Sequence, residues 1–131
     1  MPDIDYFAPE GRAKTPPLSS ATRVGGLVFV SGTPGFREDG GLDDDFGAQF
    51  ALVVTALQAV LERAGSSMRS LVKVNVLLTR AEDVAEMNRL YARAFGPAPY
   101  PARTTCVVAA LPDARMLIEI ECVAQVETGG A

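Results

Sequence analysis

The hydrophobic residues of this chain recur with two periods, and each period predicts a kind of secondary structure. Over residues 46–64, apolar side chains recur every three or four positions, which predicts a helix that ends at Gly65. The same spacing predicts a second helix over 81–95, before a Gly-Pro pair. Shorter apolar runs, bounded by glycine or polar residues, predict strands at 18–24, 27–32, 71–79, 102–110 and 116–126.

This order of elements, β-β-α-β-α-β-β, predicts one α+β domain spanning residues 1–131. Two helices and one modest sheet favour a sandwich in which both helices cover one face of a mixed, mostly antiparallel sheet. Residues 1–17, rich in proline and polar residues, predict an irregular arm, and residues 127–131 predict a frayed tail. The turn at 111–115 predicts that the last two strands form an antiparallel hairpin.

Alternation along the last two strands divides the sheet into an apolar face and a mixed face. We assign to the apolar face, under the helices, Ile118, Ile120, Cys122 and Cys106. We assign to the mixed face Glu119, Glu121, Arg103 and Thr105, with Val107, Val123 and Leu77 beside them. This mixed face is either a hydrated outer surface or an oligomer interface that contains a polar pocket.

Composition excludes several functions. The formal charge is −4 and the basic residues are scattered, which argues against nucleic-acid binding. The chain has no histidine, so Ser-His and Cys-His nucleophiles are absent. The two cysteines, Cys106 and Cys122, lack zinc-like spacing and predict reduced, buried thiols and no metal site. Without a secretory leader or an apolar stretch of ~18 residues, we expect a cytoplasmic protein that does not enter membranes.

Several residues whose side chains could bind a ligand or transfer a proton lie on the mixed face or near it. Arg103 begins a strand behind a proline-stiffened connector, where a guanidinium suits a carboxylate ligand. Glu119, expected across the hairpin, is a candidate base, and a structural Arg–Glu pair is the alternative. Ser31 is either a ligand donor or a turn cap, and Asn88 and Tyr91 are either ligand contacts or core residues.

Several motifs together resemble the RidA/YjgF/L-PSP family. They are VGGLVFVSGTPG, LERAG followed by LVKVNVLLT, MNRLYARAF, PYPARTTCVVAALP and IEIECVA, and the resemblance extends from about Leu18 to Gln125. It implies a chorismate-mutase-like fold and a homotrimer whose sheets face inward, with clefts between subunits. It also implies hydrolysis of small enamines or imines, such as 2-aminoacrylate, to 2-keto acids and ammonia without a cofactor.

The resemblance also assigns roles to residues. Arg103 matches the family's carboxylate-binding arginine, and Glu119 matches the acid that positions or activates water. Ser31 matches the serine of the SG motif, and Asn88 and Tyr91 match an N-x-x-Y helix motif. Thr105, near Arg103 in the PARTT segment, is grouped with them as substrate-binding.

Two departures from the family pattern affect the predicted activity. Leu18 occupies the position of a tyrosine that usually contributes to the pocket, and Thr33 follows the SG motif where glutamine is usual. Leu18 therefore favours two alternatives: a trimer that binds small carboxylates without turnover, or a deaminase with a more apolar pocket. Ribonuclease activity, for which parts of the family are named, fits poorly with an acidic chain that lacks histidine.

Overall fold

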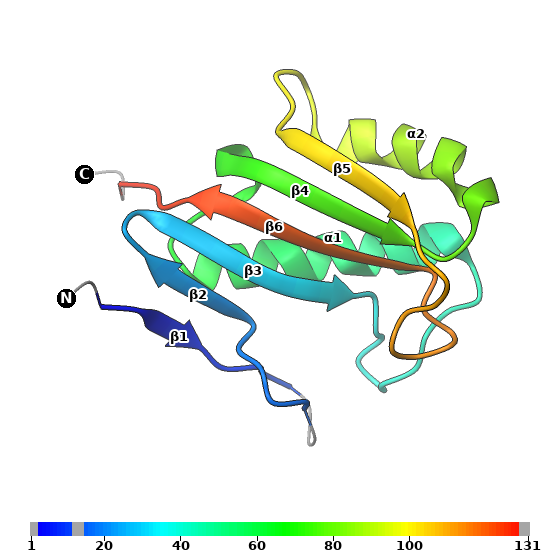
Figure 1. The fold of residues 1–131 in the computed structure, drawn as a ribbon, viewed down its shortest axis with the longest axis horizontal. Helices are drawn as coiled ribbons and strands as arrows, with labels where there is room; N and C mark the ends of the chain where they lie inside the picture. The colour runs from blue at the N-terminus through cyan, green and yellow to red at the C-terminus, as the bar shows by residue number, and fades with distance from the viewer. Residues whose placement is uncertain (1–2, 12–14, 129–131) are drawn as a thin grey trace.

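The computed structural model describes residues 3–11 and 15–128, which form one six-stranded sheet covered by two helices (Figure 1). The strands are β1 (Asp5–Phe7), β2 (Ala21–Val24), β3 (Leu27–Pro34), β4 (Leu71–Leu78), β5 (Ala102–Val107) and β6 (Ile118–Gln125). The helices are α1 (Phe46–Arg63) and α2 (Val84–Phe95), with short 3-10 turns at Met68–Ser70 and Ala81–Asp83. The strand order is β1-β2-β3-β6-β4-β5. All neighbouring strands are antiparallel except β4 and β5.

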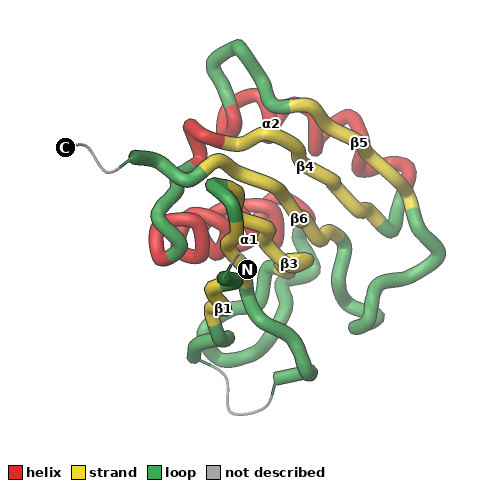
Figure 2. The backbone as a smooth tube through the Cα atoms, turned by 60° about the vertical axis from the view of Figure 1, so that its left-hand side comes forward, coloured by secondary structure: helices red, strands yellow, loops and turns green. Residues whose placement is uncertain are grey.

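Helix α1 has the predicted apolar stripe and lies across the sheet. Asp45 caps it, since its side chain accepts a hydrogen bond from the backbone N–H of Ala48 at 2.9 Å. Gly65 ends the helical segment with a positive φ of 84°. Both helices pack on the same sheet face (Figure 2), as the sequence predicted. Their apolar sides bury Val53, Leu57, Leu61 and Met87 against Val74, Val76, Ile118, Ile120 and Cys122.

The amino-terminal arm is more regular than predicted. Asp5–Phe7 forms β1, in which Phe7 pairs with Ala21 and Asp5 with Arg23. The guanidinium of Arg23 holds this strand, because it donates to Asp5 at 3.0 Å. The predicted strand from Leu18 begins only at Ala21.

The carboxyl-terminal tail, predicted to be frayed, is held at its start, because the backbone N–H of Glu127 donates to Gly65 O at 2.9 Å. The predictions for residues 1–2, 12–14 and 129–131 lie outside the described residues.

The predicted hairpin of the last two strands is wrong. Strand β5 pairs with β4 in parallel, and β6 lies between β3 and β4. The 12-residue helix α2 connects β4 to β5, and such a crossover is the usual way to place two neighbouring strands in parallel. The segment between β5 and β6 therefore passes over the end of β4 instead of forming a tight turn.

This topology also reverses the predicted faces of β5. Arg103 pairs with Val74 and Thr105 with Val76, and both valines are fully buried under the helices. Because paired residues point to the same side of a sheet, Arg103 and Thr105 belong to the helix side. Cys106 belongs to the opposite side, named here the outer face, and is exposed instead of buried.

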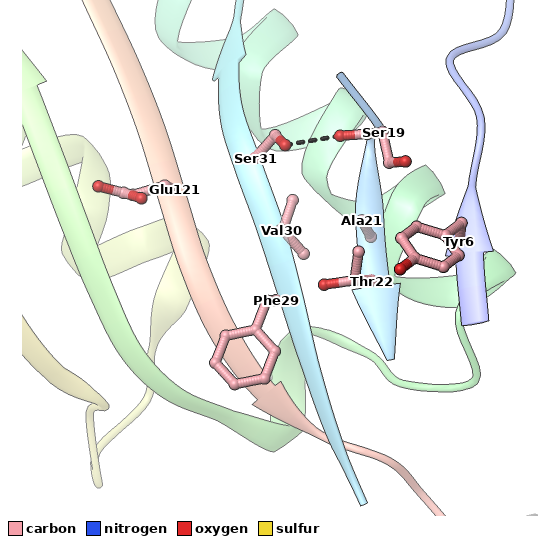
Figure 3. Close-up of a pocket in the computed structure, with 8 residues that line it drawn as sticks. All are labelled: Tyr6, Ser19, Ala21, Thr22, Phe29, Val30, Ser31 and Glu121. Atoms are coloured by element: carbon pink, nitrogen blue, oxygen red, sulfur yellow. Dashed lines mark hydrogen bonds between the residues drawn. The ribbon is translucent and has the colours of Figure 1, made fainter. Parts of the chain in front are cut away.

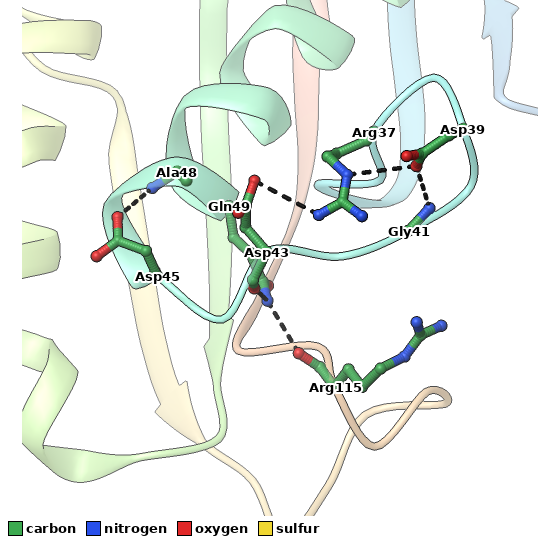
Figure 4. Close-up of polar contacts among 8 residues, drawn as sticks. All are labelled: Arg37, Asp39, Gly41, Asp43, Asp45, Ala48, Gln49 and Arg115. Atoms are coloured by element: carbon green, nitrogen blue, oxygen red, sulfur yellow. Dashed lines mark hydrogen bonds and ion pairs between the residues drawn. The ribbon is translucent and has the colours of Figure 1, made fainter.

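Two long loops lie at one end of the sheet, one between β3 and α1 and the other between β5 and β6. They are joined through Gln49, a fully buried polar residue of α1 (Figure 4). Its amide nitrogen donates to Asp43 O at 2.7 Å and to Arg115 O at 2.9 Å. Its amide oxygen accepts from the backbone N–H of Leu117 at 2.9 Å. Leu117 immediately precedes β6, so Gln49 fixes the point at which β6 enters the sheet.

Candidate functional site

The predicted site residues form two groups on opposite sides of the sheet. Arg103, Asn88 and Tyr91 lie together where β5 meets α2. Glu119 and Ser31 lie on the outer face, where Glu119 pairs with Leu77 of β4. Since Arg103 shares the helix side with Val74, the side chains of Arg103 and Glu119 point away from each other within one chain.

Arg103 is held in one orientation by three side chains of α2. Its Nη2 donates to Asn88 Oδ1 at 2.6 Å, and its Nη1 lies 3.8 Å from the sulfur of Met87. Its guanidinium carbon lies 4.6 Å from the ring centroid of Tyr91. Tyr91 is itself stacked on Phe95, with centroids 4.0 Å apart. This support leaves part of the guanidinium fork available in a hollow of about 320 Å³ lined by Asn88, Tyr91, Ala92, Tyr100, Pro101 and Arg103.

Arg103 has no acidic partner among the residues that the structure describes. None of the ion pairs within residues 3–11 and 15–128 includes it, so the predicted alternative of a structural Arg–Glu pair is not what the structure contains. A positioned guanidinium without a counter-ion is suited to bind a carboxylate through two parallel hydrogen bonds. The hydroxyl of Tyr91 is buried without a hydrogen-bond partner in the described part of the chain, and burial raises its pKa although Arg103 opposes the shift.

Glu119 lies against the glycine of the SG motif. A β-carbon added to Gly32 would lie only 2.8 Å from Cδ of Glu119 and 2.9 Å from Oε2, so this close approach requires glycine. Gly32 and Ser31 sit where the register of β3 and β6 shifts between Val30 and Thr33, which marks an irregularity of the bulge type. Partial burial, followed by the negative charge of Glu121, raises the pKa of the Glu119 carboxyl above its usual range.

Ser31 lies in a second hollow, of about 340 Å³, on the outer face (Figure 3). Its hydroxyl donates to Ser19 O at 2.6 Å, which leaves the oxygen lone pairs available as acceptors. The Thr33 hydroxyl donates to Ser31 O at 2.8 Å. The hollow is lined by Tyr6, Ser19, Ala21, Thr22, Phe29, Val30, Ser31 and Glu121.

Of the other predicted site residues, Leu18 precedes β2 and is 47% exposed, and Thr105 lies two positions after Arg103 on the same helix side of β5. Three further residues of the two groups were missed. Glu121 could have been found, because alternation places it beside Glu119. Tyr6 lies in the arm predicted to be irregular, and the contact of Gly32 with Glu119 has no signal in the sequence beyond the glycine itself.

The described residues contain no cluster of metal-ligating side chains, and one of the two thiols is buried. Burial raises the pKa of Cys122 to about 12, so this thiol is protonated at neutral pH. Across residues 3–11 and 15–128, no group of three or more acidic or cysteine side chains could hold a metal ion. In the same residues, neither helix combines the length and the apolar character needed to span a bilayer.

Comparisons with known proteins match this fold and these motifs. Residues 11–126 match the family model described as Endoribonuclease L-PSP. Reactive Intermediate Deaminase A of Arabidopsis thaliana is 37% identical over 110 residues, which cover 82% of this chain and 58% of that protein. The crystal structure of RidA from an Antarctic Psychrobacter species has a TM-score of 0.80 at 37% identity, covering 87% and 92% of the two chains. A Rid-family protein of Yersinia pestis has a TM-score of 0.85 at 30% identity, covering 95% and 100%.

Proposed function

The chain belongs to the endoribonuclease L-PSP family, the family of the RidA and YjgF proteins with their chorismate-mutase-like fold, and we propose that it hydrolyses small enamines or imines of amino acids to 2-keto acids and ammonia. The observation that carries this proposal is Arg103, a positioned guanidinium that no acid neutralises in the described residues. Its natural ligand is a carboxylate, the group that 2-imino acids and 2-keto acids share.

The proposed site requires more than one copy of the chain. Arg103 and Glu119 point to opposite sides of one sheet, so one chain cannot direct both at a small ligand. We propose a homotrimer in which the β5 edge of one copy, with Arg103, packs against the outer face of the next copy. The exposed apolar side chain of Leu27 on the outer face supports this interface. Covering the site would also exclude water and strengthen the contact between guanidinium and carboxylate.

The proposed reaction needs positioning and one acid/base group. Arg103 of one copy binds the substrate carboxylate, and an enamine first gains a proton at carbon and loses one from nitrogen to become the imine. Water held by Glu119 of the next copy attacks the imine carbon and gives its proton to the carboxylate, while the nitrogen takes up a proton. The tetrahedral carbinolamine then collapses: the hydroxyl releases its proton to solvent as the C=O bond forms, the C–N bond breaks, Glu119 gives its proton to the leaving amine, and ammonia and the keto acid depart.

The raised pKa of Glu119 suits this role. Partial burial and the neighbouring charge of Glu121 raise the pKa of the carboxyl and so make the carboxylate a stronger base than an exposed glutamate. The chain offers no histidine for the same step. The proposed reaction uses an arginine site, one acid and an already electrophilic carbon, and it includes no cofactor step.

Binding of small carboxylates without turnover is the second candidate. The observation that favours it is Leu18, an exposed apolar residue where the resemblance expects a tyrosine. The two candidates share Arg103 as the carboxylate anchor and differ in whether Glu119 activates water. An assay of turnover therefore distinguishes the two candidates, whereas an assay of binding does not.

The test combines keto-acid binding, ammonia release and light scattering. We expect light scattering to give three times the chain mass of 13.8 kDa. Arg103→Ala should abolish both calorimetric binding of 2-oxobutyrate and ammonia release from 2-aminoacrylate, with the assembly intact. Arg89→Ala, which removes an exposed arginine of α2 paired with Glu86, is the matched control and should change neither. Unchanged binding in Arg103→Ala contradicts the proposed site, and binding without any turnover selects the second candidate.

A further inference from the structure

We propose that the hollow beside Ser31 holds the side chain of the ligand, and that Tyr6 and Phe29 make the site select aliphatic and aromatic 2-imino and 2-keto acids. This inference rests on the proposed function, because it assigns a side-chain subsite to the same ligand. It makes β1, a strand at the edge of the sheet, part of the site.

The register of four strands aligns the lining of this hollow. Tyr6 of β1 pairs with Thr22 of β2, Thr22 pairs with Phe29 of β3, and Phe29 pairs with Val123 of β6. These residues form one row across the outer face, with side chains on the same side. Ser31 stands two positions further along β3, next to the row (Figure 3).

The two rings of this row have no role in the core. Tyr6 is 68% exposed and Phe29 is 42% exposed, whereas the next residue along each strand, Phe7 or Val30, packs toward the helix side. Two aromatic side chains that share one hollow gain stability when an apolar group covers them. The hollow of about 340 Å³ is large enough for the side chain of one amino acid.

The hollow is polar at one end and aromatic at the other. Ser31 and Glu121 line the first end, and Ser31 is bonded through the chain to Gly32, which lies against the Glu119 carboxylate. Tyr6 and Phe29 line the second end, on either side of Thr22. A substrate whose reacting carbon lies beside Glu119 would therefore extend its side chain toward the two rings.

Strand β1 is fixed firmly enough to present Tyr6. Phe7 lies beneath two guanidinium groups, 5.3 Å from that of Arg23 and 5.9 Å from that of Arg63. Arg23 also donates to Asp5 and to Ala64 O, at the end of α1. Because Phe7 points to the helix side, alternation directs Tyr6 to the outer face.

The test compares calorimetric binding of phenylpyruvate and pyruvate to the assembled protein. We expect the parent protein to bind phenylpyruvate at least tenfold more tightly. Tyr6→Ala and Phe29→Ala should each weaken phenylpyruvate binding about tenfold and change pyruvate binding less than twofold. Tyr6→Phe keeps the ring and should keep the preference. Ile4→Ala removes another exposed apolar side chain next to β1, outside the hollow, and is the control.

Arg103→Ala distinguishes failure of this subsite from failure of the proposed function. If Tyr6→Ala and Phe29→Ala leave the preference unchanged while Arg103→Ala abolishes binding of both acids, the subsite is wrong and the carboxylate site stands. If Arg103→Ala binds both acids like the parent, the proposed function is wrong. A parent protein that binds neither keto acid overturns both proposals.

Discussion

The carboxyl group of Glu119 occupies the space into which a side chain at Gly32 would project. The first atom in the way is the far end of a flexible side chain, and the backbone of Gly32 has no positive φ that would demand glycine. Gly32→Ala should therefore displace the Glu119 carboxylate while leaving the fold nearly unchanged. We therefore expect the close contact to matter for the proposed reaction and to contribute little to stability.

We expect Gly32→Ala to lower ammonia release at least tenfold and to change the free energy of unfolding by less than about 1 kcal/mol. Urea denaturation and the ammonia assay check the two parts. Gly35→Ala is the contrast, because its β-carbon would clash with the backbone oxygen of Gln49, which cannot move aside. That variant should lose stability first. Full activity in Gly32→Ala would mean that the position of the Glu119 carboxylate does not matter for turnover.

A second prediction concerns the pH dependence of stability through Glu119. Burial and Glu121 raise the pKa of this carboxyl in the folded state, so the folded protein holds the proton more tightly than the unfolded chain. The protonated form is favoured at low pH, and this contribution is lost as pH rises from the unfolded pKa of about 4.5 through the higher folded value. Glu119→Gln should therefore be more stable than the parent at pH 7 and about equally stable at pH 4.

The measurement is urea unfolding of both proteins at the two pH values. The same variant should keep keto-acid binding and lose ammonia release, because an amide cannot accept a proton from water. Glu38→Gln, in an exposed loop, is a control for the loss of one negative charge. Equal stability of Glu119→Gln and the parent at pH 7 would contradict the raised pKa.

The sequence predicted the elements whose residues have one-sided burial. The stripe of α1 and the alternation of Ile118, Ile120 and Cys122 each allow one orientation, because the other would expose the apolar set. Strand β5 lacks this constraint: Arg103 and Thr105 lie on one side and Thr104 on the other, and neither set is apolar. Alternation groups such residues but does not say which group faces the helices, so the β5 faces and the hairpin were both predicted wrongly.

For the candidate site, the sequence predicted which residues belong to it but not how they are oriented. Arg103 and Glu119 were identified through their residue types and motifs, and these depend on chemistry that the sequence carries directly. That they point to opposite sides depends on β6 entering the sheet between β3 and β4, a pairing between segments far apart in the chain. Tyr6 was missed because a strand of three residues has too few positions to establish a period.

A third prediction concerns Gln49, which joins the two loops before α1 and β6. Gln49→Leu removes three hydrogen bonds and leaves two part-buried carbonyl groups and one N–H group without this partner. We expect a loss of about 2–4 kcal/mol in the free energy of unfolding, measured in urea. Gln49→Glu retains an oxygen that can accept from Leu117 but cannot donate to Asp43 O when ionised, and it should also be destabilised. A stability equal to the parent's would show that the loops hold their places without Gln49.

A fourth prediction addresses Leu18. If the absence of a tyrosine here limits turnover of 2-aminoacrylate, Leu18→Tyr should raise the rate of ammonia release severalfold. Leu18→Phe adds a ring without a hydroxyl and separates hydrogen bonding from packing. Because Leu18 is 47% exposed, both changes should alter stability by less than about 0.5 kcal/mol. A high rate of ammonia release in the parent protein, unchanged in Leu18→Tyr, would show that Leu18 does not limit turnover.

The last prediction separates the charge of Arg103 from its orientation. Asn88 Oδ1 accepts from Nη2 at 2.6 Å, and it is the acceptor that holds the guanidinium against the Tyr91 ring. Asn88→Ala leaves the charge in place but frees the fork, so binding of 2-oxobutyrate should weaken about tenfold without being abolished. Arg103→Lys keeps a charge but offers no planar fork, so it should bind hardly better than Arg103→Ala.

Asn88→Asp provides the sharpest comparison. Its carboxylate would still accept from Nη2, but it would also supply the counter-ion that Arg103 lacks in the described residues, and a ligand carboxylate would then meet a neutralised pair. We expect Asn88→Asp to bind 2-oxobutyrate more weakly than Asn88→Ala, although it preserves the hydrogen bond. Calorimetric titration at pH 7 ranks the affinity for 2-oxobutyrate of four variants: Asn88→Ala, Asn88→Asp, Arg103→Lys and Arg103→Ala. If Asn88→Asp binds as tightly as the parent, the unpaired charge of Arg103 is not what attracts the ligand, and the site serves a group other than a carboxylate.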